Sequence, residues 1–159
     1  MRIAALAASV AAALAFASPA LAVTVETKMS PEFQEKLDKD IGAREARILT
    51  NILTSKITST FDARGVKAEK VVVTIEDAKH NRPTLEQVSA KPGLDPIRSI
   101  SIGGAKLSGI AYDAAGNEIG RFDYRWYETD ITNLIAATTW SDARTSFDRF
   151  ARRFADKLT

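Results

Sequence analysis

The sequence contains no cysteine among its 159 residues and only one histidine, His80. Without thiols the chain has no disulfide, no cysteine nucleophile and no cysteine to carry the lipid of a bacterial lipoprotein. With one imidazole, a metal site or a catalytic triad would have to be built around His80. We therefore expect no cofactor and no metal, no catalytic residues, and a fold that is held together by packing alone.

The chain also lacks a charge excess and a long apolar segment after residue 22. Removing Arg2 from the 22 basic residues leaves 21, against 20 acidic residues. This balance gives no electrostatic reason to expect nucleic acid or anionic lipid as the main partner. No later stretch has the length and hydropathy of a membrane span, so we expect no transmembrane segment in the mature chain.

The N-terminal residues have the three parts of a secretory signal peptide. A short positive start, Met1-Arg2, precedes the alanine-rich apolar run Ile3–Phe16, and Pro19 is followed by the small-x-small pattern Ala20-Leu21-Ala22. An amphipathic helix is the alternative, but this segment has no polar face at helical spacing. We expect a signal peptide over residues 1–22, cleaved after Ala22, and a single periplasmic domain over residues 23–159.

Two long amphipathic helices are predicted from apolar residues that recur every three or four positions. The first is capped by Asp40 and ends at Gly65, and Glu45 falls outside its apolar stripe. The second follows the Thr-x-x-acid arrangement Thr139–Asp142. A short helix begins at Ser30 and ends near residue 40. The apolar stripes consist of Ile41, Ile48, Leu49, Ile52, Leu53, Ile57 and Phe61, and of Ala143, Phe147, Phe150, Ala151, Phe154 and Leu158. We expect both long helices to pack on a sheet; the alternative for the first is binding to a membrane surface or a partner.

The predicted strands show apolar and polar residues in alternation. Lys70–Asp77 is one strand, and Ile97–Tyr112 and Asn117–Glu128 form a hairpin across the turn at residues 113–116. Val23–Lys28 is a further strand at an edge. Gly103-Gly104 marks a bulge or a close backbone approach. Residues 78–96 read as a long loop, which is either functional or only a connection.

Together these elements predict an α+β fold. We expect a two-layer sandwich in which a three- to four-stranded, mainly antiparallel meander is covered on one face by two long helices. The aromatic side of the last strand, with Tyr124 and Trp126, should lie under Phe147, Phe150 and Phe154.

Two surface regions are candidates for contact with a ligand or partner. Arg121, Arg125 and Tyr127 lie on the charged side of the last strand, where they could grip an anion, a glycan or a peptide backbone. Asn81 and Arg82 lie in the loop that follows His80. In each case the alternative is an ordinary solvated surface, and a solvated loop residue is likewise the expectation for His80.

Several stretches in this order resemble small proteobacterial envelope proteins of uncharacterised function, some of them lipoproteins with domains of unknown function. The stretches are Asp77–Thr84, Ile102–Ala105, Asp113–Glu118 and Thr139–Ala143 with Phe147, Phe150 and Ala151. The lipid-bearing cysteine of the lipoprotein members is absent. The resemblance implies a periplasmic location and no enzymatic activity, and it supplies no catalytic residues.

We therefore expect a non-catalytic binding or accessory module of the cell envelope. It would act through the sheet face, the 78–96 loop or a free sheet edge, on an envelope protein or a peptidoglycan-related ligand. The alternative is an envelope hydrolase that acts on glycan or peptide with acids such as Asp77 and Asp123, which a pocket holding two carboxylates of raised pKa would favour. The expected state is a monomer or a weak homo-oligomer.

Overall fold

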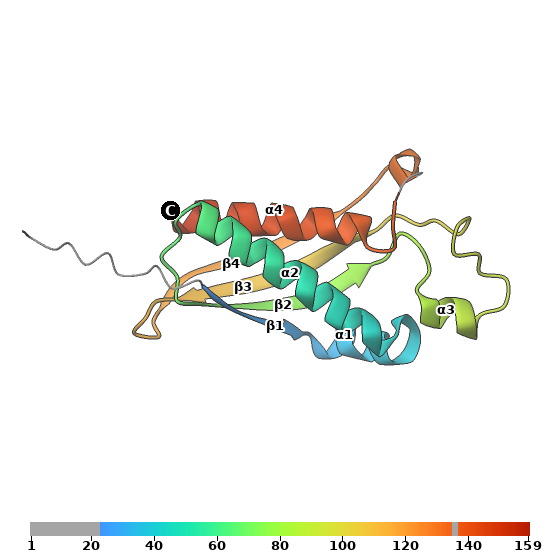
Figure 1. Ribbon diagram of the computed structural model, residues 1–159, viewed down its shortest axis with the longest axis horizontal. Helices are drawn as coiled ribbons and strands as arrows, with labels where there is room; N and C mark the ends of the chain where they lie inside the picture. The colour runs from blue at the N-terminus through green and yellow to red at the C-terminus, as the bar shows by residue number, and fades with distance from the viewer. Residues whose placement is uncertain (1–22, 135–136) are drawn as a thin grey trace, which may run out of the picture.

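The computed structural model describes residues 23–134 and 137–159, so the predicted signal peptide lies outside the described residues. The fold is α+β, as predicted, with one four-stranded sheet and four α-helices in the described part of the chain (Figure 1). The strands are β1 (Thr24–Met29), β2 (Lys70–Lys79), β3 (Gly104–Tyr112) and β4 (Glu118–Tyr127). The helices are α1 (Pro31–Lys36), α2 (Ala43–Ala63), α3 (Leu85–Ala90) and α4 (Ser141–Leu158), with short helical turns η1 (Leu37–Ile41) and η2 (Ile131–Leu134). None of these described helices combines the length and hydropathy that crossing a bilayer requires.

The sheet has the strand order β1-β2-β3-β4 and is of mixed type. β2, β3 and β4 form the predicted antiparallel meander, whereas β1 runs parallel to β2, with Thr24 opposite Lys70 and Met29 opposite Ile75. The parallel direction follows from the connection, because α1, η1 and α2 carry the chain back to the start of β2. A parallel pair needs such a long crossover, which is usually helical.

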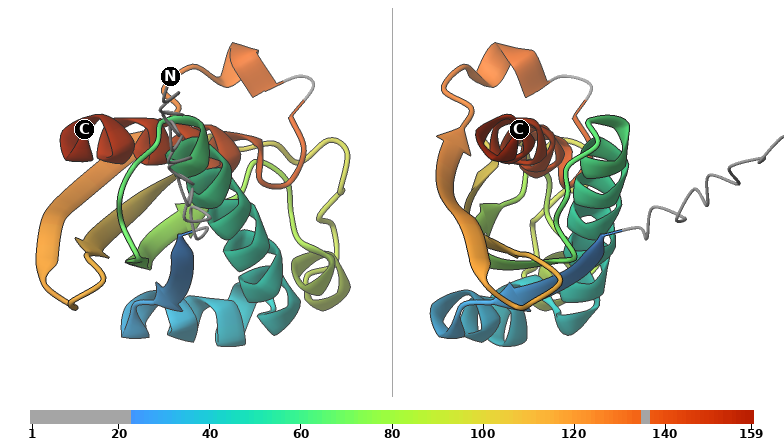
Figure 2. Two further views of the ribbon diagram at one scale, coloured as in Figure 1. Left: turned by 60° about the vertical axis from the view of Figure 1, so that its left-hand side comes forward. Right: turned by 90° about the vertical axis from the view of Figure 1, so that its left-hand side faces the viewer.

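The two long helices pack together on the sheet, α2 beside β1 and α4 over β3 and β4 (Figure 2). Phe147, Phe150 and Phe154 of α4 are fully buried, as the sequence predicts. The ring of Phe150 lies 5.7 Å from that of Phe122 on β4. Gly109 on β3 makes this approach possible, since a Cβ atom there would lie 2.7 Å from Cζ of Phe150.

The first arm of the predicted hairpin is too long. β3 begins at Gly104, and residues 97–103 form an irregular segment that leaves Ile100 and Ile102 exposed. The expected close backbone approach is present, because a Cβ atom on Gly103 would lie 2.8 Å from the carbonyl oxygen of Lys79. The shifts in strand register fall elsewhere, between Ile75 and Asp77 and again between Ala111 and Tyr112.

The helix ends differ from the prediction where the expected capping side chain bonds to a residue far away in the sequence. Ser30 caps α1 as expected, and Gly65 follows α2 with a positive φ of 62°. Asp40 does not cap α2: its carboxylate accepts a hydrogen bond from Gln87, and Gly42 precedes the helix instead. The predicted 78–96 loop contains α3, whose N-terminus has a complete capping box between Thr84 and Gln87.

Candidate functional site

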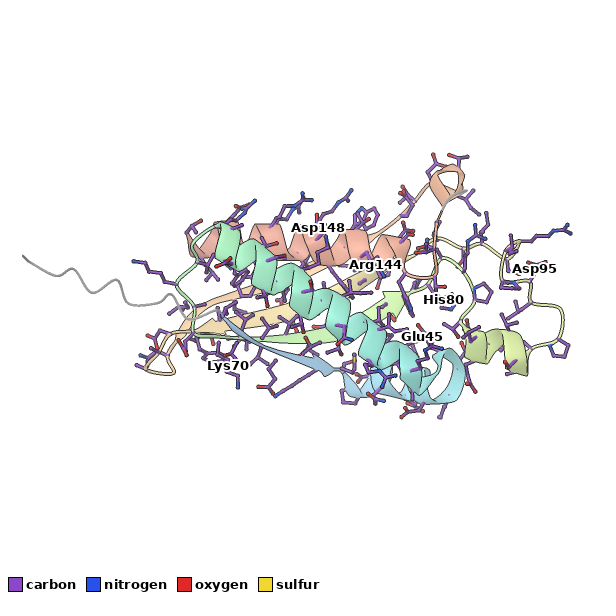
Figure 3. The ribbon with its side chains drawn as sticks, viewed as in Figure 1. Glu45, Lys70, His80, Asp95, Arg144 and Asp148 are labelled. Atoms are coloured by element: carbon purple, nitrogen blue, oxygen red, sulfur yellow. The ribbon has the colours of Figure 1, made fainter. Side chains whose placement is uncertain are left out.

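A pocket of about 400 Å³ lies where β2 ends, between that strand, α1, η1 and the irregular segment before β3. We call it the His80 pocket. Figure 3 shows His80 at this end of the sheet, beyond the start of α2, which carries Glu45. The lining residues are Lys36, Asp40, Ile41, Asp77, Ala78, Lys79, His80, Ser101 and Ile102.

Both carboxylates of the pocket are engaged by neighbouring groups. Asp77 accepts hydrogen bonds from the Tyr127 hydroxyl and from Lys36 Nζ, each at 2.7 Å. Burial, and then the hydrogen bond to Asp77, raise the pKa of Tyr127, so its hydroxyl stays protonated and donates. Asp40 is paired with Lys91, which lowers the pKa of that carboxyl, with a further contribution from Gln87. The arrangement keeps Asp40 ionised at neutral pH.

His80 is half-buried rather than a solvated loop residue. Its ring meets the ring of Trp140 edge to face, with 5.9 Å between the centroids. Burial lowers the pKa of His80 below its ordinary value of 6.5, whereas the charge of Asp40 and a hydrogen bond to the Arg82 backbone oppose this shift. The imidazole is therefore neutral at pH 7, and its buried Nδ1 has no hydrogen-bond partner among the described residues. A buried polar atom without a partner is rare in folded proteins, which marks this ring as a candidate for contact with a ligand.

Lys79 is the second polar group of the pocket that lacks an ionic or hydrogen-bond partner among the described residues. Its ammonium lies 5.1 Å from the centre of the Tyr127 ring and has no carboxylate partner in the part of the chain that the structure describes. The Tyr127 ring can pack closely because residue 104 is glycine: a Cβ there would lie 2.7 Å from Cδ1 of the ring. Lys79 thus adds to the lining of the His80 pocket a cation that has no carboxylate partner among the described residues.

A buried hydrogen bond behind His80 holds Trp140 in place. Trp140 Nε1 donates to Glu45 Oε2 at 2.7 Å, and both residues are buried. The prediction that Glu45 lies outside the apolar stripe is wrong. Its position is four residues from both Ile41 and Leu49, so helical spacing alone could have identified it as an inward-facing residue.

Asn81 and Arg82 connect chain segments in this region. Asn81 is fully buried, and its amide donates to Asp142 at 2.5 Å while its own oxygen accepts from the Asp142 backbone at 2.9 Å. The same carboxylate accepts a hydrogen bond from the Gly103 backbone N–H at 2.9 Å. Asp142 is therefore engaged with another segment, and the predicted capping arrangement of Thr139 and Asp142 does not form at the start of α4. Arg82 donates to the carbonyl oxygens of Ala137 and Ile97. We therefore assign Asn81 a role in holding the loop.

The three other predicted surface residues are spread along β4. Tyr127 borders the His80 pocket through Asp77. Arg125 lies further along the strand, and Arg121 lies near the opposite end, where it pairs with Glu118 at 3.1 Å. Asp123, the second acid of the hydrolase hypothesis, is exposed and does not line the pocket. The structure thus brings one of these residues, Tyr127, to the site.

Within the described residues, no group of three histidine, cysteine, aspartate or glutamate side chains could hold a metal ion. Comparison with known proteins gives no further assignment, because no family model and no curated protein sequence matches the chain.

Proposed function

We propose that the protein is a non-catalytic periplasmic binding module with a two-layer sandwich fold. Its ligand carries a free carboxylate beside an apolar group and occupies the His80 pocket. One observation carries the proposal: both acids of the pocket already have partners, whereas among the described residues Lys79 has no carboxylate partner and Nδ1 of His80 has no hydrogen-bond partner. A carboxylate would accept from the Lys79 ammonium and from the imidazole in its Nδ1–H tautomer.

The apolar part of the ligand would lie against the other side of the pocket. Ile41 and Ala78 provide a buried apolar floor, and Ile102 at the rim is 42 % exposed. The same irregular segment exposes Ile97 and Ile100. A site with an apolar wall and a few placed polar groups is typical of small-ligand recognition.

The polar contacts support binding more than hydrolysis. A general acid at neutral pH needs a pKa near 7, yet the pairing with Lys91 lowers the pKa of Asp40. Asp77 is held by Lys36 and Tyr127, and Asp123 is not in the pocket. The carboxylate pair of the hydrolase hypothesis is therefore not assembled here.

The location and the ligand class rest on the sequence. The pattern of Met1–Ala22 favours export, and the resemblance to envelope proteins favours the same compartment. In that setting, a carboxylate next to an apolar side chain describes a peptide C-terminus, including that of a peptidoglycan stem peptide. The predicted envelope partner could present such a terminus.

The single histidine gives a direct test, because His80 is the only source of imidazole signals in NMR spectra. We would titrate ¹⁵N-labelled protein with N-acetyl-leucine and, separately, with N-acetyl-leucinamide. The two probes differ only in the carboxylate. We expect saturable shifts of the His80 ring signals with the acid and at least about tenfold weaker binding of the amide, since a lost charged hydrogen bond is worth about 1.5–3 kcal/mol.

Two variants complete the test. Lys79→Ala should abolish the response, whereas Lys70→Ala, which removes a lysine on the same strand that is paired with Glu26, should leave it unchanged. Equal binding of acid and amide, or an unchanged response in Lys79→Ala, would overturn the proposal. Cleavage of a peptide substrate that is lost in Asp77→Asn would instead support the hydrolase alternative.

A further inference from the structure

β4 is an edge strand with an unpaired side, since the order β1-β2-β3-β4 leaves it without a second neighbour in the described chain. The backbone N–H of Glu128 donates to the carbonyl of Gly103 on the β3 side at 2.9 Å. Antiparallel strands alternate the direction of their hydrogen bonds, so the backbone groups of Asp123, Arg125 and Tyr127 point away from β3. These N–H and C=O groups form a template for an added strand.

Positive charge flanks this edge on the side of α4. On the helix side, the guanidinium of Arg149 lies 4.2 Å from the centre of the Trp126 ring, and that of Arg153 lies 5.2 Å from the centre of the Tyr124 ring. On the opposite sheet face Arg125 is exposed, and so is Asp123, whose carboxylate lies two residues along the same strand. None of these three arginines forms an ion pair with a carboxylate of residues 23–134 or 137–159. Arg152, which lies on α4 between Arg149 and Arg153 in sequence, does form an ion pair, with Asp148 at 2.7 Å.

The spacing of the stacked arginines matches a strand. Arg149 and Arg153 are four residues apart on α4, which corresponds to about 6 Å along a helix. Residues two apart on a strand are separated by about 6.7 Å and point to the same face. Two acidic side chains in an acid-x-acid pattern on an added strand would therefore each reach one arginine.

We propose that the β4 edge binds an extended, acidic segment of another protein by strand addition. The two acids of its acid-x-acid pattern face α4, where they pair with Arg149 and Arg153 above the rings of Trp126 and Tyr124. The residue between them points to the opposite face, beside Arg125. The main chain of the segment bonds to the free backbone groups of residues 123–127.

The structure also limits the length and the identity of the occupant. Lys157 donates to the carbonyl oxygen of Arg121 at 2.6 Å and so occupies the edge at that end. A second copy is a poor occupant, because pairing β4 with itself would bring Arg149 and Arg153 of both copies together, where like charges repel. An acidic partner segment meets both conditions. The edge meets the border of the His80 pocket only at Tyr127, and the proposal does not depend on the function proposed for that pocket.

Two blocked peptides of equal composition test the proposal by fluorescence anisotropy. The first is acetyl-Thr-Val-Glu-Val-Glu-Val-Thr-amide, and the second is acetyl-Thr-Val-Glu-Glu-Val-Val-Thr-amide, each with the same dye. Only the first can direct both glutamates to one face. We expect the first to bind at least about tenfold more tightly at low salt, and to lose binding when the backbone nitrogens that face β4 are methylated. The blocked ends offer no terminal carboxylate, so the His80 signals should not move.

Substitutions on α4 provide the second arm. Arg149→Gln with Arg153→Gln should weaken the first peptide at least about tenfold, and Arg152→Gln should not, with circular dichroism used to confirm that each variant is folded. Equal binding of the two peptides overturns the acid-x-acid pattern. Binding that survives N-methylation overturns strand addition, and concentration-dependent dimerisation without peptide in light scattering would show that a second copy occupies the edge.

Discussion

Replacing Phe150 by alanine should cost the protein about 3–5 kcal/mol of stability, the usual range for a buried phenylalanine. Phe150 is fully buried, and its ring lies 5.5 Å from that of Phe154 and 5.7 Å from that of Phe122. Its side chain joins α4 to both β3 and β4, so no single neighbour can move to fill the space. The upper half of the range is therefore expected.

The contact with Gly109 makes this prediction more specific. Gly109→Ala would place a methyl group 2.7 Å from Cζ of Phe150, and such overpacking should cost about 1–3 kcal/mol. The same methyl group would also lie 2.9 Å from Cε1 of Phe154, so the Phe150→Ala background relieves one of its two close contacts, and the double variant should be more stable than the sum of the single losses predicts. For residues in contact the difference is about 0.5–3 kcal/mol.

Urea unfolding of the wild type, the two single variants and the double variant measures this cycle. Ile119→Ala, at a residue that is 41 % exposed, is the control and should change stability by less than about 1 kcal/mol. A loss below about 1 kcal/mol for Phe150→Ala would remove α4 from the core. Strict additivity of the two losses would refute the contact between Phe150 and Gly109.

Three further predictions concern the end of the sheet. Trp140→Phe removes the donor to buried Glu45 and should cost about 1–3 kcal/mol in urea unfolding, part of which Glu45→Leu should restore. Burial lowers the pKa of His80 below 6.5, so the unfolded chain binds a proton more readily than the folded one. The free energy of unfolding should therefore fall as the pH drops through 6.5 towards the lowered pKa, and an unchanged pH dependence in His80→Asn would contradict this. Gly104→Ala, at a φ of 145° and against β4, should cost more than Gly65→Ala, which has a φ of 62° and no atom within 4 Å.

The elements with long periodic patterns could be predicted from the sequence. The apolar spacing of α4 places Phe147, Phe150 and Phe154 correctly in the core, because three or four residues per turn leave one consistent face. The alternation in β2 and the turn that ends at Gly116 are equally local, the latter with a φ of 83°. Each of these features depends on residues that are close together in the chain.

The predictions from sequence are wrong where contacts between residues far apart in the chain determine the structure. The sequence reads Ile97–Ile102 as part of a strand because Ile100 and Ile102 alternate, but β3 begins only where Tyr127 can cover Gly104. A side-chain pattern likewise says nothing about which way β1 runs beside β2. The pocket itself combines α1, η1, β2 and the segment before β3, so no single motif could have indicated it.

The buried polar contacts around His80 explain how an irregular loop can form a fixed site. Asn81 joins the loop to the N-terminus of α4 through Asp142, and the contact between Trp140 and Glu45 joins α4 to α2. His80 lies between these two contacts, against the Trp140 ring. We therefore expect its position to be set before the proposed ligand binds, so that binding would not have to order the loop. A substitution at Asn81 should accordingly weaken ligand binding without touching the ligand, whereas a substitution at Arg121, at the far end of β4, should not.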